Sequence, residues 1–571
     1  MIKKHLSRPL QAVTTALVVS LLASVSVLPL SFAVGKASAK ETMAEKQFVP
    51  YYGYGPSYVQ PANIEALFPK PDVSFETPAF QKNKEAFTSQ EEMMAYITEL
   101  AASNKQVKLV TIGTSLEGRD IPLLIFSKDL SNVKKNKDKP LIWLQAQIHG
   151  NEPAAGESAL VLAKWLSEEK LGAELLDKVN IAIVPRINPD GSYSFKRYIA
   201  TNQDANRDYM KVEYPEVQAI HNAINEYEPD VILDAHEYGV NYSQFSDVGT
   251  KGANSSYDVL ISSAKNLNIP ESLRKMSDNL LLADVQKALD KEELAHHAYF
   301  TLAKGKDGKV TATEGSTETR IGRNALGLKN TLTFLVETRG IGIGRADFER
   351  RVYSQVHAHS SFIQSTAAHA SEVKAAVAKA RQEISDKGRK ANDNDKIVVL
   401  SENKRIPNQS LVVVDLAEAK KVSAPIDWVS STDAYPVMER ERPTAYIMPP
   451  AYHDIATKLQ NLGVKVSKLS LETTVAVESY TVVDNKVNPT YENGHFTNQV
   501  TTNVSEKTKT FPAGSYVYQM DQPNANFIAL TMEPESVDSY VTFNFIAVEK
   551  GDEVPVYRYM LEKALPTRSK E

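Results

Sequence analysis

The chain has 571 residues, of which 42% are hydrophobic and 24% charged, and its net charge is −5. This length corresponds to about two to four domains, and the composition excludes collagen-like and largely disordered proteins. The slightly acidic balance provides no basic surface for phosphates, which argues against nucleic acid as the main partner. Cysteine is absent. Disulfides, thiolate metal sites and cysteine nucleophiles are therefore excluded, and His, Asp and Glu remain as metal ligands.

The first segment, residues 1–39, predicts a secretory signal peptide. Basic residues at Lys3, Lys4 and Arg8 precede a long, mostly apolar run, and small residues suited to cleavage follow it. An N-terminal membrane anchor is the competing interpretation, because the apolar run is long. No later segment approaches the ~20 apolar residues of a spanning helix. We therefore expect an exported protein, periplasmic or extracellular, with no membrane association beyond the signal peptide.

The next elements indicate an α/β domain. Residues 40–84 are rich in Tyr, Pro and Gly and predict an extended lead-in, and at Ser89 a capping box with Glu92 starts a helix. We predict a domain over residues 85–390. Apolar runs alternate there with helical patterns, which is typical of a largely parallel, buried sheet flanked by helices. The predicted strands and helices, in chain order, are Val107–Ile112, Ile121–Ser127, Leu141–Ile148, helix Glu157–Glu169, Val179–Pro185, helix Tyr214–Glu226, Val231–Ala235, Leu332–Glu337 and helix Phe348–Ala380.

The pattern changes beyond a polar, glycine-containing segment that ends the last of these helices. Residues 396–571 show β-type alternation, as in Thr474–Val483, with one helix near Tyr452–Leu462. We predict a separate, mainly β accessory domain here. No motif in it indicates a function.

Three apolar strands of the α/β domain end in polar side chains that could form a metal site. His149 and Glu152 follow one strand, His236 follows another, and Glu337 ends a third. Ligands of such sheets gather at the carboxyl ends of the strands. Two imidazoles and a carboxylate are the ligand set of a catalytic zinc whose fourth position is left to water. Glu337 would then be a spare carboxylate near that water.

The spacing of His149 and Glu152 is weak evidence by itself. His369 and Glu372 have the same spacing inside a helix of alanines and charges, where we expect a solvated surface pair. The preceding strand and the matching strand-end His236 distinguish the first pair from the second. From the residues alone, a zinc site and two core histidines with satisfied hydrogen bonds both remain open.

A series of motifs resembles a known family. The motifs, in chain order, are Gly113–Arg119, His149–Glu152, Asn188–Gly191, Asp204–Asp208, His236 and Phe334–Arg339. Over roughly residues 85–385 this order is similar to the zinc metallocarboxypeptidase family of the carboxypeptidase A type, because several ordered motifs are far more specific than any one. The resemblance implies a zinc carboxypeptidase-like fold with a mixed, mostly parallel sheet flanked by helices. It also suggests a bacterial, exported member with a C-terminal β-rich domain.

The resemblance implies one zinc ion per chain, held by His149, Glu152 and His236. Glu337 would act as the general base and later the acid. The chemistry is consistent, because peptide hydrolysis at neutral pH needs an activated water and zinc can lower the pKa of its bound water to about 7. Glu337 could take a proton from this zinc-bound water and deliver it to the departing amine.

The same resemblance assigns four residues to the substrate. Arg197 would polarise the scissile carbonyl, Asn206 and Arg207 would hold the C-terminal carboxylate, and Tyr238 would line the cleft. An arginine fork suits a free carboxylate, which is the feature that distinguishes an exopeptidase from an endopeptidase. Surface salt bridging is the alternative role for both arginines.

One stretch departs from the digestive members of the family, which carry a mobile tyrosine about twenty residues before the catalytic glutamate. No tyrosine lies between Tyr299 and Tyr353, and the stretch contains Arg320 and Arg323 instead. One of these arginines could favour an acidic group on the substrate. The alternative is that both only pair with nearby carboxylates, namely Glu314, Glu318 or Asp347.

These observations predict a zinc-dependent metallocarboxypeptidase that hydrolyses the C-terminal peptide bond of peptides with a free carboxylate. Two alternatives stay open. One is a zinc amidohydrolase acting on cell-wall stem peptides or N-acyl amino acids, and the other is a catalytically inactive peptide-binding module. No G-x-S-x-G elbow or phosphate-binding loop occurs. The residue preference and the oligomeric state are not specified by the sequence.

Overall fold

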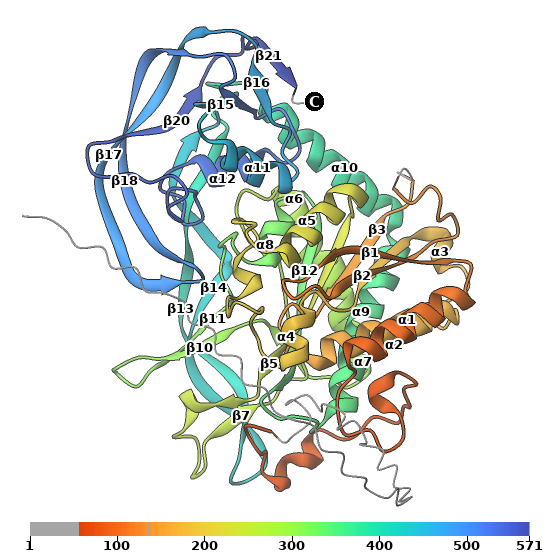
Figure 1. Cartoon of the computed structure of the whole chain (residues 1–571). Helices are drawn as coiled ribbons and strands as arrows, with labels where there is room; N and C mark the ends of the chain where they lie inside the picture. Colours follow the sequence, from red (N-terminus) through yellow and green to blue (C-terminus); the bar gives the residue numbers. More distant parts are fainter. Residues whose placement is uncertain (1–55, 135–137, 570–571) are drawn as a thin grey trace, which may run out of the picture. The chain divides into compact units, whose positions relative to one another are not determined.

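The computed structural model describes residues 56–134 and 138–569 (Figure 1). The predicted signal peptide and the first part of the predicted lead-in lie outside the described residues. Within these ranges, no helix combines the length and the apolar composition that crossing a membrane requires.

An eight-stranded mixed sheet forms the centre, with the strand order β1-β2-β4-β3-β5-β12-β8-β9. Its strands are β1 Val107–Thr114, β2 Asp120–Phe126, β3 Leu141–Ala146, β4 Asn180–Val184, β5 Val231–Gly239, β8 Val259–Ser263, β9 His296–Ala298 and β12 Leu332–Ile341. Strand β3 runs parallel to β4 and β5, β12 runs parallel to β5, and β8 runs parallel to β9, whereas the other neighbours are antiparallel. The predicted α/β fold with a mixed, mostly parallel sheet is confirmed.

Helices pack on this sheet because its central strands are buried along nearly their whole length and must be covered on both faces. Helices α2 and α9 contact each other and both contact β5 and β12. The helices of this part are α1 Gln90–Ser103, α2 Pro153–Ser167, α3 Leu175–Lys178, α4 Pro189–Ser194, α5 Pro215–Tyr227, α6 Glu271–Met276, α7 Ala283–Lys291, α8 Gly322–Gly327, α9 Phe348–Ala368 and α10 Ala370–Lys387.

Two sequence predictions about helices can be compared with the structure directly. The capping box of α1 is confirmed, because Ser89 Oγ accepts from the Glu92 N–H at 3.1 Å and Glu92 Oε2 accepts from the Ser89 N–H at 2.8 Å. The predicted single helix over residues 348–380 is wrong in detail. It is two helices, since the backbone of His369 leaves the helical conformation at φ −109° and ψ 26°.

A second, six-stranded sheet has the order β10-β11-β14-β13-β7-β6. Its strands are β6 Asn241–Tyr242, β7 Ala253–Ser255, β10 Thr301–Lys304, β11 Val310–Thr313, β13 Lys396–Asp415 and β14 Lys420–Glu441. The long ribbon of β13 and β14 pairs with β7 on one side and β11 on the other, so strands from both sides of residue 396 share one sheet (Figure 1).

The third sheet is antiparallel and has seven strands, in the order β18-β17-β20-β15-β19-β16-β21. The C-terminal β-rich region, which we define as residues 396–569, contains this sheet and the β13–β14 ribbon. The bounds of its remaining elements are β15 Ala445–Met448, α11 His453–Asn461, β16 Ser467–Leu469, β17 Thr473–Glu492, β18 His495–Phe511, β19 Tyr516–Gln519, α12 Ala525–Met532, β20 Glu553–Tyr559 and β21 Thr567–Ser569. The mainly β character is as predicted, and the domain bounds 85–390 and 396–571 stay predictions.

Candidate metal centre and substrate cavity

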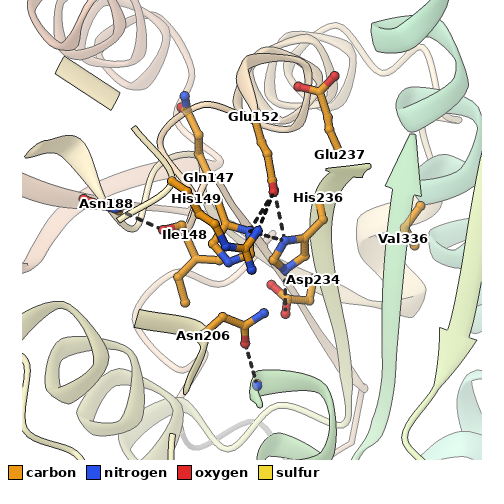
Figure 2. Close-up of polar contacts among 12 residues, drawn as sticks. Gln147, Ile148, His149, Glu152, Asn188, Asn206, Asp234, His236, Glu237 and Val336 are labelled. Atoms are coloured by element: carbon orange, nitrogen blue, oxygen red, sulfur yellow. Dashed lines mark hydrogen bonds and ion pairs between the residues drawn. The ribbon is translucent and has the colours of Figure 1, made fainter. Parts of the chain in front are cut away.

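His149, Glu152 and His236 converge at the carboxyl edge of the central sheet, and Figure 2 shows Glu152 pointing toward both rings. One carboxylate oxygen of Glu152 lies 2.6 Å from His149 Nδ1, and the other lies 3.0 Å from His236 Nδ1. The two Nδ1 atoms are 3.2 Å apart. All three side chains are buried, and their ligand atoms lie within 4.8 Å of one another. Three donor atoms therefore face one common point.

A short loop between β3 and α2 carries the first two of these side chains, and its path depends on a glycine. A Cβ atom on Gly150 would lie 1.9 Å from the carbonyl carbon of Gly191, so only glycine permits this approach. Asn188 then joins the two segments. Its Nδ2 donates to the Ile148 carbonyl at 3.1 Å, and its Oδ1 accepts from the Gly191 N–H at 2.8 Å.

Asp190 anchors the segment 188–191, which contacts this loop. Its carboxylate accepts from Ser115 Oγ at 2.7 Å, the Glu117 N–H at 2.9 Å and Arg119 Nη1 at 2.6 Å. The sequence motifs at 113–119 and 188–191 are thus two halves of one hydrogen-bonded support. They hold the metal-site loop in place rather than taking part in chemistry themselves.

Strands β5 and β12 bring His236 and Glu337 together, because the two residues are direct partners in the parallel register. Both strands continue past these residues, to Gly239 and Ile341. The expectation that His236 and Glu337 stand at strand ends is therefore wrong in detail. The neighbouring Glu237 points away from the cluster (Figure 2), where Arg351 binds it at 2.7 Å.

Each histidine has a carboxylate on the ring side that faces away from the cluster. His149 Nε2 lies 3.2 Å from Asp204 Oδ1, and His236 Nε2 lies 3.2 Å from Asp234 Oδ2. Metal-binding histidines usually have such a partner, which fixes the ring and leaves the other nitrogen for the metal. The donor set and its support fit zinc. Sequence reasoning gave neither aspartate a role, although Asp234 stands two positions before His236 and thus on the same face of β5.

The charges of the cluster change the acidity of both carboxylates. Burial alone would raise the pKa of Glu152, but His149 and His236 outweigh it by charge and hydrogen bonding and lower that pKa to about 2. Burial raises the pKa of Glu337 to about 7. Glu152 is therefore an anion at neutral pH, as a ligand must be, and Glu337 is poised between its two protonation states.

A cavity of about 560 Å³ opens over the cluster. The predicted site residues that line it are His149, Glu152, Arg197, Asn206, Arg207, Tyr238, Arg323 and Glu337. His236 belongs to the cluster but does not line the cavity. Arg320 does not line the cavity either. Tyr299 also lines the cavity, and burial raises the pKa of its hydroxyl. Sequence analysis missed it because it lies far from any motif.

Arg197 is held against the cluster by Asp204. Its Nε and Nη2 donate to Asp204 Oδ2 at 3.1 and 2.9 Å, and its Nη1 lies 3.2 Å from His149 Nδ1. Burial would lower the pKa of Arg197, but Asp204 and Glu152 raise it, so the guanidinium stays charged. Arg207 is more exposed and donates to the Asn206 carbonyl at 2.9 Å.

Arg320 turns away from the cavity into the C-terminal β-rich region. Its Nε donates to Asp538 Oδ1 at 2.7 Å, its Nη2 donates to the Val537 carbonyl at 2.9 Å, and its Nη1 bonds Glu492. Every nitrogen of the guanidinium is therefore occupied. The hypothesis that Arg320 contacts the substrate has no support in this arrangement, and the proposed preference for an acidic group passes to Arg323.

Arg323 has a different environment. It is 2% exposed, its Nη2 donates to the Ser316 carbonyl at 3.1 Å, and its Nε and Nη1 have no hydrogen-bond partner among the described residues. The expected pairing with Glu314 is not formed, because that carboxylate accepts from Ser430 and Thr432 instead. A buried guanidinium with unused donors thus lies in the cavity wall.

Known proteins share this sequence organisation. A family model described as zinc carboxypeptidase matches residues 93–212. Carboxypeptidase 2 of Trichophyton rubrum is 34% identical over 476 residues, which are 82% of this chain and 86% of that protein. The chain belongs to the zinc carboxypeptidase family. It is a metallocarboxypeptidase, a hydrolase of a family that acts on peptides, and its cofactor is zinc.

Two further similarities complete the comparison. Carboxypeptidase 2 of Trichophyton equinum is also 34% identical, over 82% of this chain and 86% of that protein. The crystal structure of carboxypeptidase A from Helicoverpa armigera is 18% identical, covers 50% of this chain and 74% of its own, and has a TM-score of 0.37. The two carboxypeptidase 2 relatives are fungal, so they give no support to a bacterial origin. The signal peptide, export and a periplasmic location stay predictions.

Proposed function

We propose that this metallocarboxypeptidase releases single residues from the C-terminus of peptides, with His149, Glu152 and His236 as zinc ligands and Glu337 as the proton carrier. The observation that supports this most directly is the convergence of three ligand atoms beside Glu337 under a single cavity. Arg197 lies in the same cavity wall. An inactive binding module would have no need to keep all five groups around one cavity.

Each group has a distinct part in hydrolysis. Zinc held by two imidazoles and a carboxylate is a Lewis acid that lowers the pKa of water to about 7. Glu337 takes a proton from the attacking water and returns it to the leaving amine nitrogen. Burial raises the pKa of Glu337 to about 7, which suits a group that must both accept and donate a proton near neutral pH. Arg197 donates to the oxyanion of the tetrahedral intermediate, and such a donor contributes about 3–4 kcal/mol to the transition state.

The position of cleavage is set by the substrate's own carboxylate. Asn206 and Arg207 lie together in the cavity wall, and a guanidinium fork matches a free carboxylate in shape and charge. A peptide whose terminal carboxylate sits there presents its last peptide bond to the metal centre. This arrangement favours removal of one residue at a time over cleavage within a chain.

The same cavity supports a preference for an acidic last residue. Arg323 lines the cavity as a buried cation whose Nε and Nη1 have no hydrogen-bond partner among the described residues, and its positive charge favours a substrate carboxylate beside it. Peptides that differ only in a C-terminal Glu, Ala or Lys test this. We expect fastest release of Glu by the wild type and loss of that advantage in Arg323→Gln. Equal wild-type rates on all three peptides would remove the proposal.

The central test combines metal content with product analysis. Wild type, Glu152→Gln and Glu337→Gln are compared with Glu372→Gln, which alters the exposed pair at the same H-x-x-E spacing. We expect zinc in the wild type, Glu337→Gln and Glu372→Gln, with much less in Glu152→Gln. Single C-terminal residues should be released only by the wild type and Glu372→Gln. Zinc without such release would favour an amide of a cell-wall stem peptide or an N-acyl amino acid, and a wild type without zinc would refute the proposed site.

A further inference from the structure

The tip of the β17–β18 hairpin reaches the loop that carries Asn206 and Arg207, although nearly three hundred residues of chain separate them. Asn493 makes a paired contact with the backbone of one residue of that loop, Asp204. Its Oδ1 accepts from the Asp204 N–H at 2.6 Å, and its Nδ2 donates to the Asp204 carbonyl at 3.0 Å. Lys211 adds a hydrogen bond of 2.9 Å to the Asn493 carbonyl.

The hairpin presents this side chain in a fixed geometry. Glu492 pairs with His495 across the hairpin, so Asn493 and Gly494 form a two-residue turn. Both have positive φ, 46° and 98°, which is the conformation that Asn-Gly turns of this type require. The flanking residues anchor the tip on either side, because Glu492 bonds Arg320 and His495 Nε2 lies 2.8 Å from Glu213.

The residue that Asn493 holds has several partners in the candidate active site. Asp204 Oδ2 accepts both hydrogen bonds from Arg197, and Asp204 Oδ1 contacts His149 and accepts from the Asn206 N–H at 2.8 Å. A shift in the Asp204 backbone would therefore move the oxyanion donor and the substrate-binding loop together. Displacements of about 1 Å in such groups can lower rates about 10²-fold.

We propose that Asn493 is a positioning residue for the carboxypeptidase reaction. By fixing both polar groups of Asp204's backbone, it sets the places of Arg197 and Asn206, and the C-terminal β-rich region thereby completes the active site. This inference rests on the proposed function, since it assigns the effect of Asn493 to the residues that bind and activate the peptide substrate.

The variant Asn493→Gly tests it, because glycine keeps the left-handed turn and removes only the paired side-chain contact. Asn408→Gly is the matched control. Asn408 also has positive φ, at 57°, is exposed on the β13–β14 ribbon and does not line the cavity. Both variants are assayed as full-length protein with measured zinc content, on the C-terminal peptide that the wild type cleaves fastest.

We expect kcat/KM to fall about tenfold in Asn493→Gly, because the lost contact is worth about 1.4 kcal/mol. A higher KM should account for part of this decrease. Asn408→Gly should match the wild type in both constants. A purely structural role would lower the melting temperature and the amount of active enzyme while leaving KM unchanged, and that result would overturn the inference. A wild type that releases no C-terminal residue would refute the proposed function instead, so the two failures are distinguishable.

Discussion

The two aspartates behind His149 and His236 should give different losses when each is changed to asparagine. Asp204 Oδ1 lies 3.2 Å from His149 Nε2 in a hydrogen bond, and Asp234 Oδ2 lies 3.2 Å from His236 Nε2 as an ion-pair contact without hydrogen-bond geometry. Asp204 also binds Arg197 through two hydrogen bonds, whereas Asp234 Oδ1 accepts from the neutral amide of Gln145 at 3.0 Å. The chain thus offers a comparison in which only Asp204 also supports Arg197, the proposed oxyanion donor.

The expected magnitudes follow from these contacts. Loss of a carboxylate behind a metal-binding histidine costs about 10–100-fold in metal affinity, so both Asp204→Asn and Asp234→Asn should bind zinc more weakly by that factor. Asp204→Asn additionally places a neutral amide against Arg197. Since an oxyanion donor is worth about 10²–10³ in kcat, kcat/KM at saturating zinc should fall by about that factor in Asp204→Asn and less than about threefold in Asp234→Asn.

The assay separates the two effects. The dissociation constant for zinc is measured by competition with a chromophoric chelator, and kcat/KM is then measured with each variant saturated with zinc. Equal losses of kcat/KM in both variants under saturation would contradict the positioning of Arg197 by Asp204. Unchanged zinc affinity in both would show that neither aspartate orients its histidine.

Three further outcomes are expected from the structure. Removing zinc with a chelator should stop the release of C-terminal residues, and adding zinc back should restore it, whereas activity that survives complete removal would contradict the metal centre. Gly150→Ala should lower the melting temperature strongly, because its Cβ would lie 1.9 Å from Gly191, while Gly239→Ala, whose Cβ meets nothing within 4 Å, should not. Burial lowers the pKa of Lys329 to about 7. Between pH 7 and 10 this lysine is therefore protonated in the unfolded state and neutral in the folded state. As the pH increases over this range, the free energy of unfolding of the wild type should rise relative to that of Lys329→Met, by up to about 1.4 kcal/mol per pH unit. Urea denaturation at several pH values measures this difference, and a constant difference would refute the assignment.

Local sequence patterns were sufficient to predict the buried strands and the polar residues that follow them. Buried strands such as β3 and β5 begin as apolar runs, and the candidate ligand residues follow or extend those runs, so their convergence could be predicted. The same reasoning separated the two H-x-x-E pairs. His369 and Glu372 are only 3.5 Å apart, yet both side chains are accessible to solvent, and among the described residues no second histidine joins them.

The supporting residues could not be predicted in the same way, because their roles depend on contacts that sequence spacing does not reveal. Arg320 and Arg323 stand three positions apart and look equivalent in the sequence. One is bound by Asp538 and the other lies in the cavity wall, and only the position of the C-terminal β-rich region makes the difference. Asp204 was part of a motif, but its contact with Asn493 links residues far apart in the chain.

The energetics of these contacts bear on whether residues 85–390 can form the active site alone. Glu314 and Arg320 are 5% and 7% exposed, and side chains of the C-terminal β-rich region bind both, Thr432 for Glu314 and Asp538 for Arg320. Removing Asp538 would break its buried ion pair with Arg320, a change that typically costs about 3–5 kcal/mol, and removing Thr432 would take hydrogen bonds from Glu314. A chain that ends before residue 396 would lose the partners of both, on either side of the cavity-lining segment 315–318. We therefore infer that the two predicted domains fold and function as one enzyme, with the C-terminal region supporting the wall of the cavity over the candidate metal centre.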